Sequence, residues 1–326
     1  MDGAAPRVCF AGQHPASIPV DPGAQRLERR VLYALAMGNE LDLDALCRKD
    51  PDERLSLHAG KVIAGSYLVE RVLGVGGMGT VVAARSLSTG ELVAIKFMLP
   101  HCAEHEHLMV RFQREARATE RLKSEHVGRV LATGEVSKNM PFIVMEYLNG
   151  EDLKSLVKRE GPLEPRQAAA YVSQACDALA EAHALGIVHR DLKPANLFLA
   201  RQPRGPSIIK VLDFGVAKFD SPNVAGDHED VTATHAMVGT HQYMAPEQIV
   251  SPHAVTALAD VWALGAILHF LLTGKTPFEA PSPYAMLTQI ALGQPVTLAS
   301  LGPELPADLV AVIQRAVSQD RDARWA

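Results

Sequence analysis

The chain has 326 residues, of which 48% are hydrophobic and 21% charged, and its formal net charge at pH 7 is −5. It is long enough to bury a sizeable core. Its net negative charge gives no support for a protein that binds nucleic acid through a basic surface. The four cysteines (Cys9, Cys47, Cys102 and Cys176) form no Cys-x-x-Cys pair, which argues against a disulfide framework or zinc cluster and for a reducing cytoplasm.

No signal peptide is visible at the N-terminus. The longest apolar stretch, residues 261–273, is too short to span a bilayer and predicts a buried helix. Residues 1–24 are rich in proline, glycine and alanine and predict a flexible leader. Residues 25–48 carry spaced leucines broken by Gly38-Asn39, which predicts two short amphipathic helices. We expect residues 1–60 to be an N-terminal extension, either loosely docked or a regulatory or partner-binding element.

Residues 61–100 predict strands and contain LGVGGMGTVVAARSLSTGELVAIK, in which Gly74, Gly76 and Gly79 form G-x-G-x-x-G. A dinucleotide fingerprint would open a helix after the last glycine, but Thr-Val-Val-Ala-Ala favours a strand. A P-loop would end in Gly-Lys-Ser/Thr, and Gly79 is followed by threonine. What remains is a glycine flap whose backbone N–H groups cover phosphates, with Lys96 arriving from the neighbouring strand.

Further along the chain, residues 105–122 predict an amphipathic helix and residues 129–147 two strands. Residues 167–184 predict a long helix, residues 187–213 a strand-loop-strand unit, and residues 220–244 a long loop of the kind that is usually functional or disordered. More helix follows to the end. The pattern indicates a β-rich lobe at 61–145 and a helical lobe from about 150.

Polar groups cluster in IVHRDLKPANLFL, residues 187–199, between two apolar runs. Burying such groups between strands costs free energy unless they are paired or serve in binding or catalysis. The segment is therefore either a salt-bridged turn or a catalytic one. In IIKVLDFGVAK, Asp213 ends an apolar strand. It is either a cap or, together with Asn196, a ligand for a hard cation such as Mg²⁺.

The glycine loop, V-A-I-K, H-R-D-L-x-x-x-N, D-F-G and A-P-E occur in one order across 61–325, and together they resemble the bacterial eukaryotic-like (Hanks-type) serine/threonine protein kinases. The resemblance implies an α+β bilobal protein-kinase fold. A small antiparallel-sheet N-lobe with one main helix (61–145) would be joined by a hinge (146–150) to a larger helical C-lobe (151–326), with an ATP cleft between them.

Phosphoryl transfer depends mainly on positioning and electrostatics. The resemblance implies that Asp191 orients the substrate hydroxyl and accepts its proton and that Lys193 stabilises the transferring phosphoryl group. Lys96 would pair with the α/β-phosphates and be held by Glu115, with Glu120 as the alternative. Asn196 and Asp213 would hold Mg²⁺, with Mn²⁺ as the alternative ion. The implied ATP-binding residues are Leu73, Gly74, Gly76, Gly79, Val81, Ala94, Lys96, Met145, Glu146, Leu148 and Phe198.

Arg190 would grip a phosphate on the activation loop, because arginine binds phosphate bidentately. We expect autophosphorylation at Thr232 or Thr234; the alternative is that both are simply solvated. The spacing of His228, His235 and His241 fits no closed zinc site. The remaining implied structural residues are Thr240, which would help seat the acceptor hydroxyl, Asp260 beneath the catalytic loop, and the buried pair Glu247 and Arg324.

Lys193 and Thr240 favour serine and threonine over tyrosine as acceptors. The expected partners are protein substrates and a second copy for trans-autophosphorylation, with no nucleic acid and no membrane segment in the chain. Two departures from the family stand out: His126-Val127-Gly128 replaces the usual His-Pro-x, and the last helix would be cut short at Ala326. The rival interpretations are a nucleotide-binding pseudokinase, a scaffold acting through the N-terminal extension, and a small-molecule phosphotransferase.

Overall fold

The computed structural model describes residues 57–76, 79–136, 140–214, 241–293, 301–302 and 305–325. The predicted leader and helices of 1–48, most of the predicted 220–244 loop, and the candidate residues Thr232, Thr234 and Thr240 lie outside the described residues. The chain divides into two units, Met1–His58 and Ala59–Ala326, and all of the described strands and helices belong to the second unit.

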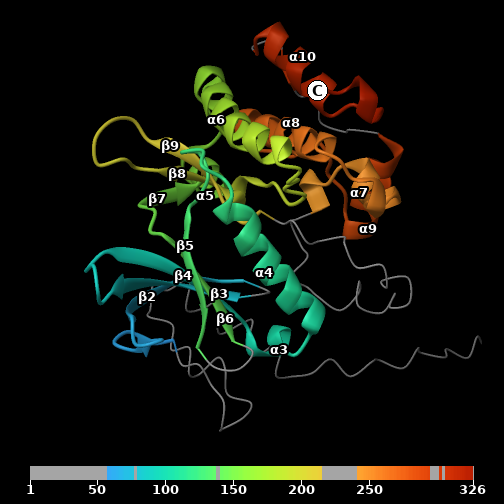
Figure 1. The fold of residues 1–326 in the computed structure, drawn as a ribbon. Helices are drawn as coiled ribbons and strands as arrows, with labels where there is room; N and C mark the ends of the chain where they lie inside the picture. Colours follow the sequence, from blue (N-terminus) through green and yellow to red (C-terminus); the bar gives the residue numbers. More distant parts are fainter. Residues whose placement is uncertain are drawn as a thin grey trace, which may run out of the picture. The chain divides into compact units, whose positions relative to one another are not determined.

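The first part of this unit is a six-stranded antiparallel sheet in the order β1-β2-β3-β4-β6-β5 (Figure 1). Its strands are β1 (Val62–Ile63), β2 (Tyr67–Val75), β3 (Gly79–Ser86), β4 (Leu92–Met98), β5 (Val130–Glu135) and β6 (Pro141–Glu146). The register pairs Val81 with Lys96 and Ala94 with Met145. Because paired residues share a face, these four side chains lie on the same side of the sheet.

Helix α4 (Glu106–Glu120) packs on that face after the short helix α3 (Pro100–Ala103). Phe112 and Ala116 on its apolar stripe are buried against Met98 and Ile143 of the sheet. This confirms the amphipathic helix expected over 105–122 and orients α4 so that its inner face meets the strand that carries Lys96. Helix α3 was not predicted.

The rest of the unit is mainly helical and includes a three-stranded sheet, β7-β8-β9. Its elements are β7 (Gly150–Asp152), α5 (Leu153–Glu160), α6 (Pro165–Ala184), η1 (Pro194–Asn196), β8 (Leu197–Ala200), β9 (Ile208–Val211), η3 (His241–Tyr243), α7 (Pro246–Val250), η4 (Pro252–Ala254), α8 (Leu258–Thr273), α9 (Pro283–Leu292), α10 (Ala307–Ala316) and η6 (Arg321–Ala323).

Helix α8 is the centre of this part. Twelve of its 16 residues are buried, as expected for a helix that is apolar on every face. It ends at Gly274, whose φ of 72° is the left-handed conformation that commonly closes helices. The buried helix predicted from residues 261–273 is therefore confirmed. Among the described helices, none has both the length and the hydropathy that a bilayer span requires.

The prediction of a strand at the start of residues 187–213 is wrong. Residues 187–193 form no strand, and β8 begins only at Leu197. The reason is that the backbone N–H groups of His189 and Arg190 donate to the Asp260 carboxylate instead of to a neighbouring strand. Asp213 does not end β9 either: the strand stops at Val211, and Asp213 has a φ of 54°.

Candidate active site

The glycine loop joins β2 to β3. Gly76 N–H donates to Gly79 C=O at 2.8 Å, which closes the described part of the turn. A Cβ on Gly79 would collide with the backbone carbonyl of Phe97, so glycine is required there for packing. A Cβ on Gly74 would meet no described neighbour, and one on Gly76 would make only an ordinary contact with the carbonyl oxygen of Gly79. Among the described residues there is therefore open space beside Gly74 and one ordinary contact beside Gly76.

Lys96 joins three segments of the chain. Its Nζ lies 2.8 Å from Glu115 Oε1 on α4 and 2.9 Å from Asp213 Oδ1 beyond β9. Of the two glutamates that the sequence offers for this contact, Glu115 is the one that makes it, while Glu120 is exposed. The result is one ammonium group held between two carboxylates.

The charges in this cluster stabilise one another. Burial by itself would lower the pKa of Lys96, but the carboxylates of Asp213 and Glu115 outweigh burial and raise its pKa. Burial by itself would raise the pKa of Asp213, but Lys96, with smaller contributions from His189 and Lys193, lowers it. Both groups are therefore charged at neutral pH.

The catalytic-loop candidates lie in the segment before β8. Lys193 Nζ is 3.0 Å from Asp191 Oδ2. Asn196 donates from Nδ2 to the backbone carbonyl of Asp191 at 2.9 Å, and no described hydrogen bond uses its Oδ1. The loop therefore presents a carboxylate, an ammonium group and an amide oxygen within six residues.

This loop is held from beneath by α8. Asp260, which is 1% exposed, accepts hydrogen bonds from the backbone N–H groups of His189 and Arg190 at 2.8 and 2.9 Å. It also lies 2.7 Å from His183 Nε2 on α6. One buried carboxylate thus fixes two consecutive peptide groups before Asp191.

His189 links the loop to the segment that carries Asp213. Its Nδ1 accepts from the Asp191 N–H at 3.3 Å, so Nε2 bears the proton and donates to the carbonyl of Leu212 at 3.0 Å. Its ring also packs against Phe214, with the centroids 4.9 Å apart. The positions of Asp191 and Asp213 are therefore coupled through one buried side chain.

The remaining ATP-site candidates occupy the sheet and the strands beyond it. Val81 and Ala94 share a face with Lys96, and Met145 pairs with Ala94. Leu148 lies between β6 and β7, and Phe198 lies in β8. Leu73 is in β2 and 40% exposed.

Three hydrogen bonds near these residues were not predicted from the sequence. The carboxylate of Glu146 accepts from Lys210 Nζ and from Arg129 N–H, both at 2.8 Å. Gln248 donates to the carbonyl of Arg190 at 2.9 Å. The sequence does contain two signals, a lysine inside the apolar run IIKVL and a glutamine directly after A-P-E. Neither signal indicates which residue the side chain contacts.

The pair Glu247 and Arg324 meets as the sequence suggested. Arg324 Nη1 and Nη2 lie 2.7 and 3.0 Å from the two carboxylate oxygens of Glu247.

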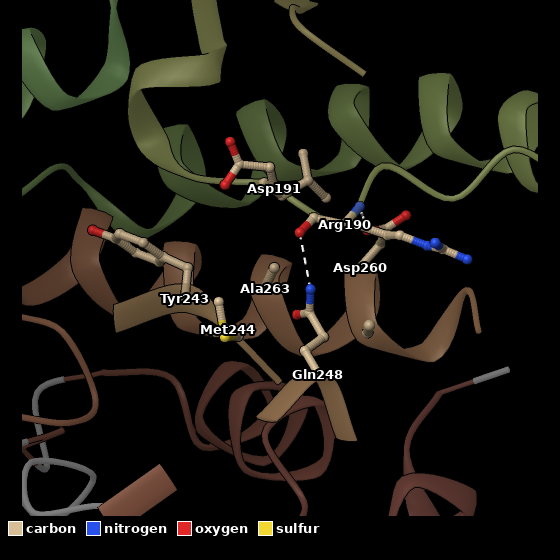
Figure 2. A pocket seen from close by; sticks show the side chains of 9 residues that line it. Arg190, Asp191, Tyr243, Met244, Gln248, Asp260 and Ala263 are labelled. Carbon is tan, nitrogen blue, oxygen red and sulfur yellow. Dashed lines mark hydrogen bonds between the residues drawn. The ribbon is translucent and has the colours of Figure 1, made fainter. Parts of the chain in front are cut away.

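A small cavity lies next to Asp191, between the catalytic loop, α7 and α8 (Figure 2). No group of three histidine, cysteine or acidic side chains suited to a metal ion occurs among the described residues, and His241 is the only described member of the histidine trio.

Comparison with known proteins places this arrangement in a family. The model of the protein kinase domain matches residues 67–325. Serine/threonine-protein kinase pkn3 of Myxococcus xanthus is 39% identical over 247 residues, covering 76% of this chain and 44% of the relative. Serine/threonine-protein kinase PknB of Mycobacterium tuberculosis is 35% identical over 266 residues, covering 81% and 41%. Pkn1 of Myxococcus xanthus is 39% identical over 265 residues, covering 81% and 37%.

The chain thus spans about two fifths of the length of these relatives. The matched region contains strands β2 to β6 of the six-stranded sheet, the helical part and the residues gathered around Lys96 and Asp191. The chain therefore belongs to the protein kinase family and has its bilobal fold.

Proposed function

We propose that this protein is a serine/threonine protein kinase that transfers the γ-phosphoryl group of ATP to hydroxyl groups of protein substrates. The observation that carries the proposal is Lys96, held at 2.8 and 2.9 Å between Glu115 and Asp213. A lysine fixed in this way, beside a carboxylate that suits a divalent cation, is the arrangement that phosphoryl transfer requires. The names of the bacterial relatives support the choice of serine and threonine as acceptors.

The glycine loop, Lys96 and the residues proposed to contact adenine would together bind ATP. The space beside Gly74 and Gly76 lets backbone N–H groups approach the phosphates closely. Lys96 neutralises phosphate charge while Glu115 fixes its position. Val81, Ala94 and Met145, on the same face as Lys96, supply apolar surface for adenine, with Phe198 opposite and the backbone of Glu146 and Leu148 alongside.

Asp213 and Asn196 fit a magnesium ion, because an ionised carboxylate and an amide oxygen are hard ligands. The lowered pKa of Asp213 keeps it ionised, and the bond from Asn196 Nδ2 to the loop leaves Oδ1 as the ligand atom. Bound Mg²⁺ would neutralise charge that develops on the phosphates.

Asp191 would carry the proton transfer. Its carboxylate would orient the acceptor hydroxyl and take its proton as the oxygen attacks phosphorus. Lys193, 3.0 Å away, would stabilise the transferred group. Asp260 and His189 keep the loop in place while this happens.

We further infer that residues 61–326 are the catalytic domain and residues 1–60 an extension. We also infer that the chain works in the cytoplasm, where the thiols of Cys102 and Cys176 would stay reduced. Activation would follow autophosphorylation at Thr232 or Thr234 between two copies of the chain, with Arg190 binding the new phosphate.

The test is a phosphotransfer assay with Mg-ATP on the wild type and Asp191→Asn, with modified sites mapped by mass spectrometry. The expected result is phosphate on serine or threonine of the wild type or of a generic protein substrate, and none with the variant. Thermal melting with and without Mg-ATP adds a second readout, because ligand binding raises the melting temperature. A raised melting temperature without transfer would indicate a pseudokinase and overturn the proposed activity.

A further inference from the structure

The catalytic loop bends sharply at Arg190, the residue before Asp191. Its φ is 63°, in the left-handed region that a non-glycine residue keeps only where its surroundings hold it. The N–H of Arg190 donates to Asp260 Oδ1 at 2.9 Å, and its carbonyl accepts from Gln248 Nε2 at 2.9 Å. The peptide groups on both sides of the bend are therefore held, one from α8 and one from α7.

Gln248 is itself held in one orientation. It is 4% exposed, and its Oε1 accepts from the backbone N–H of Ala245 at 2.9 Å. Ala245 is the N-cap of α7 and Gln248 its third residue, so this bond is half of a capping box; alanine has no side-chain oxygen to supply the other half. Only one orientation of the amide satisfies both bonds, with the oxygen on Ala245 and the nitrogen on Arg190.

Helix α7 is anchored by the neighbouring residue. Glu247 forms its bidentate pair with Arg324, whose side chain is fully buried. Two consecutive side chains thus connect α7 in two directions, one to Arg324 after η6 and the other to the catalytic loop.

Figure 2 shows the amide of Gln248 pointing toward the Arg190 carbonyl, while the Asp191 carboxylate points to the other side of the loop. Gln248 and Asp191 both help to line the small cavity, together with Tyr243, Met244, Ala259 and Ala263.

We propose that Gln248 is a positioning residue for phosphoryl transfer: by holding the left-handed bend at Arg190 it sets the direction of Asp191, and it ties that direction to the position of α7. This inference rests on the proposed function, in which Asp191 accepts the proton of the substrate. Movement of α7, which comes after the predicted 220–244 loop along the chain, would therefore be transmitted to Asp191 through one amide group.

Two variants separate the two bonds of Gln248. Gln248→Glu keeps an acceptor for the Ala245 N–H but turns a second oxygen toward the Arg190 carbonyl. Gln248→Met has a similar length and removes both bonds without burying a charge. Gln319 is the control for the loss of an amide-to-carbonyl bond at an exposed position, since its Nε2 donates to the carbonyl of Ala291 at 2.6 Å between α9 and the segment after α10. Gln319→Glu and Gln319→Met therefore lose the same kind of bond elsewhere.

The first readout is steady-state kinetics with Mg-ATP and a protein substrate. We expect kcat to fall about tenfold or more in both Gln248 variants, because small misplacements of a reacting group are costly. The KM for ATP should stay within about twofold, as expected for a residue that does not touch bound nucleotide. Unchanged kcat in both Gln248 variants, or a loss of kcat equal to that of the Gln319 variants, would overturn the proposal.

The second readout does not depend on activity. Hydrogen exchange measured by mass spectrometry over residues 187–193 should become faster in the Gln248 variants and remain unchanged in the Gln319 variants, with thermal melting used to correct for global stability. If the wild type transferred no phosphate, the proposed function would fail, yet this measurement would still show whether Gln248 holds the loop. Unchanged exchange would overturn the positioning role.

Discussion

Glu115 Oε1 accepts a hydrogen bond from Lys96 Nζ at 2.8 Å and thereby ties α4 to β4. Glu120, on the same helix, is exposed. Five residues along a helix turn the side chain by about 140°, so the two glutamates cannot both face the sheet. The position of α4 is therefore linked to the position of the lysine through one acidic residue.

Glu115→Gln is expected to lower kcat on the order of 10- to 100-fold, because a neutral amide holds the ammonium group less firmly and small displacements of a positioned group are costly. Phosphotransfer assays at saturating Mg-ATP measure this. Glu120→Gln is the matched control and should keep wild-type kcat. Equal losses in the two variants would show that Lys96 is not positioned through Glu115.

Much of this site could be predicted because the protein kinase motifs are local. The glycine loop, H-R-D and A-P-E are read from consecutive residues. Helix α4 has a clear helical period, and α8 is recognised from a continuous apolar run. The order of the motifs along the chain is sufficient to imply the fold.

The unpredicted features depend on partners distant in sequence. The left-handed φ of Arg190 follows from bonds to Asp260 and Gln248, which are 70 and 58 residues away. The contact between Glu146 and Lys210 spans 64 residues. Such bonds arise only when tertiary packing brings the groups together. The strand expected at 187 does not form for the same reason, because backbone N–H groups of that segment donate to the distant Asp260 carboxylate instead of to a neighbouring strand.

Gly76→Ala is expected to raise the KM for ATP several-fold without lowering stability. Among the described residues the added methyl group would make only an ordinary contact. The replacement also reduces the entropy of the unfolded chain, which is worth about 0.4–1 kcal/mol where the backbone allows it. The methyl group would instead occupy the space proposed for phosphate. Thermal melting and ATP titrations of the rate measure the two effects.

Gly302→Ala controls for the removal of glycine, since its methyl group would also meet no described neighbour. It should leave the KM for ATP unchanged. If Gly76→Ala also left it unchanged, the glycine loop would not approach the phosphates as proposed.

Arg324→Met is expected to lower the free energy of unfolding by about 3–5 kcal/mol, because it leaves the carboxylate of Glu247 buried and without its cation. The side chain of Arg324 is fully buried and that of Glu247 is 10% exposed. The substitution also removes a cation–π contact, since the guanidinium lies 4.9 Å from the centroid of the Trp262 ring. Urea denaturation provides the measurement.

Arg85→Met is the control for an exposed ion pair. Arg85 lies 2.7 Å from Glu70, with both side chains about a third or more exposed, so its loss should cost less than about 1 kcal/mol. Similar losses in Arg324→Met and Arg85→Met would show that burial does not determine the importance of the Glu247–Arg324 pair.

The cluster around Lys96 predicts how stability depends on pH. The pKa of Asp213 is lowered by Lys96 in the folded chain, so its contribution is fully present above the ordinary aspartate pKa of about 3.9 and is lost as the pH falls through the folded value. The pKa of Lys96 is raised by Asp213 and Glu115, which outweigh burial. Its contribution is therefore fully present below about pH 10.4 and is lost as the pH rises through the folded value.

The difference in free energy of unfolding between the wild type and Lys96→Met should accordingly be constant from about pH 5 to pH 9, and the advantage of the wild type should shrink below about pH 4. Urea denaturation at a series of pH values measures it, with Arg85→Met as the control for general effects of losing a cation. A step in the difference near pH 6–7 would contradict this account. It would show that a group other than Asp213 and Lys96 sets the pH dependence.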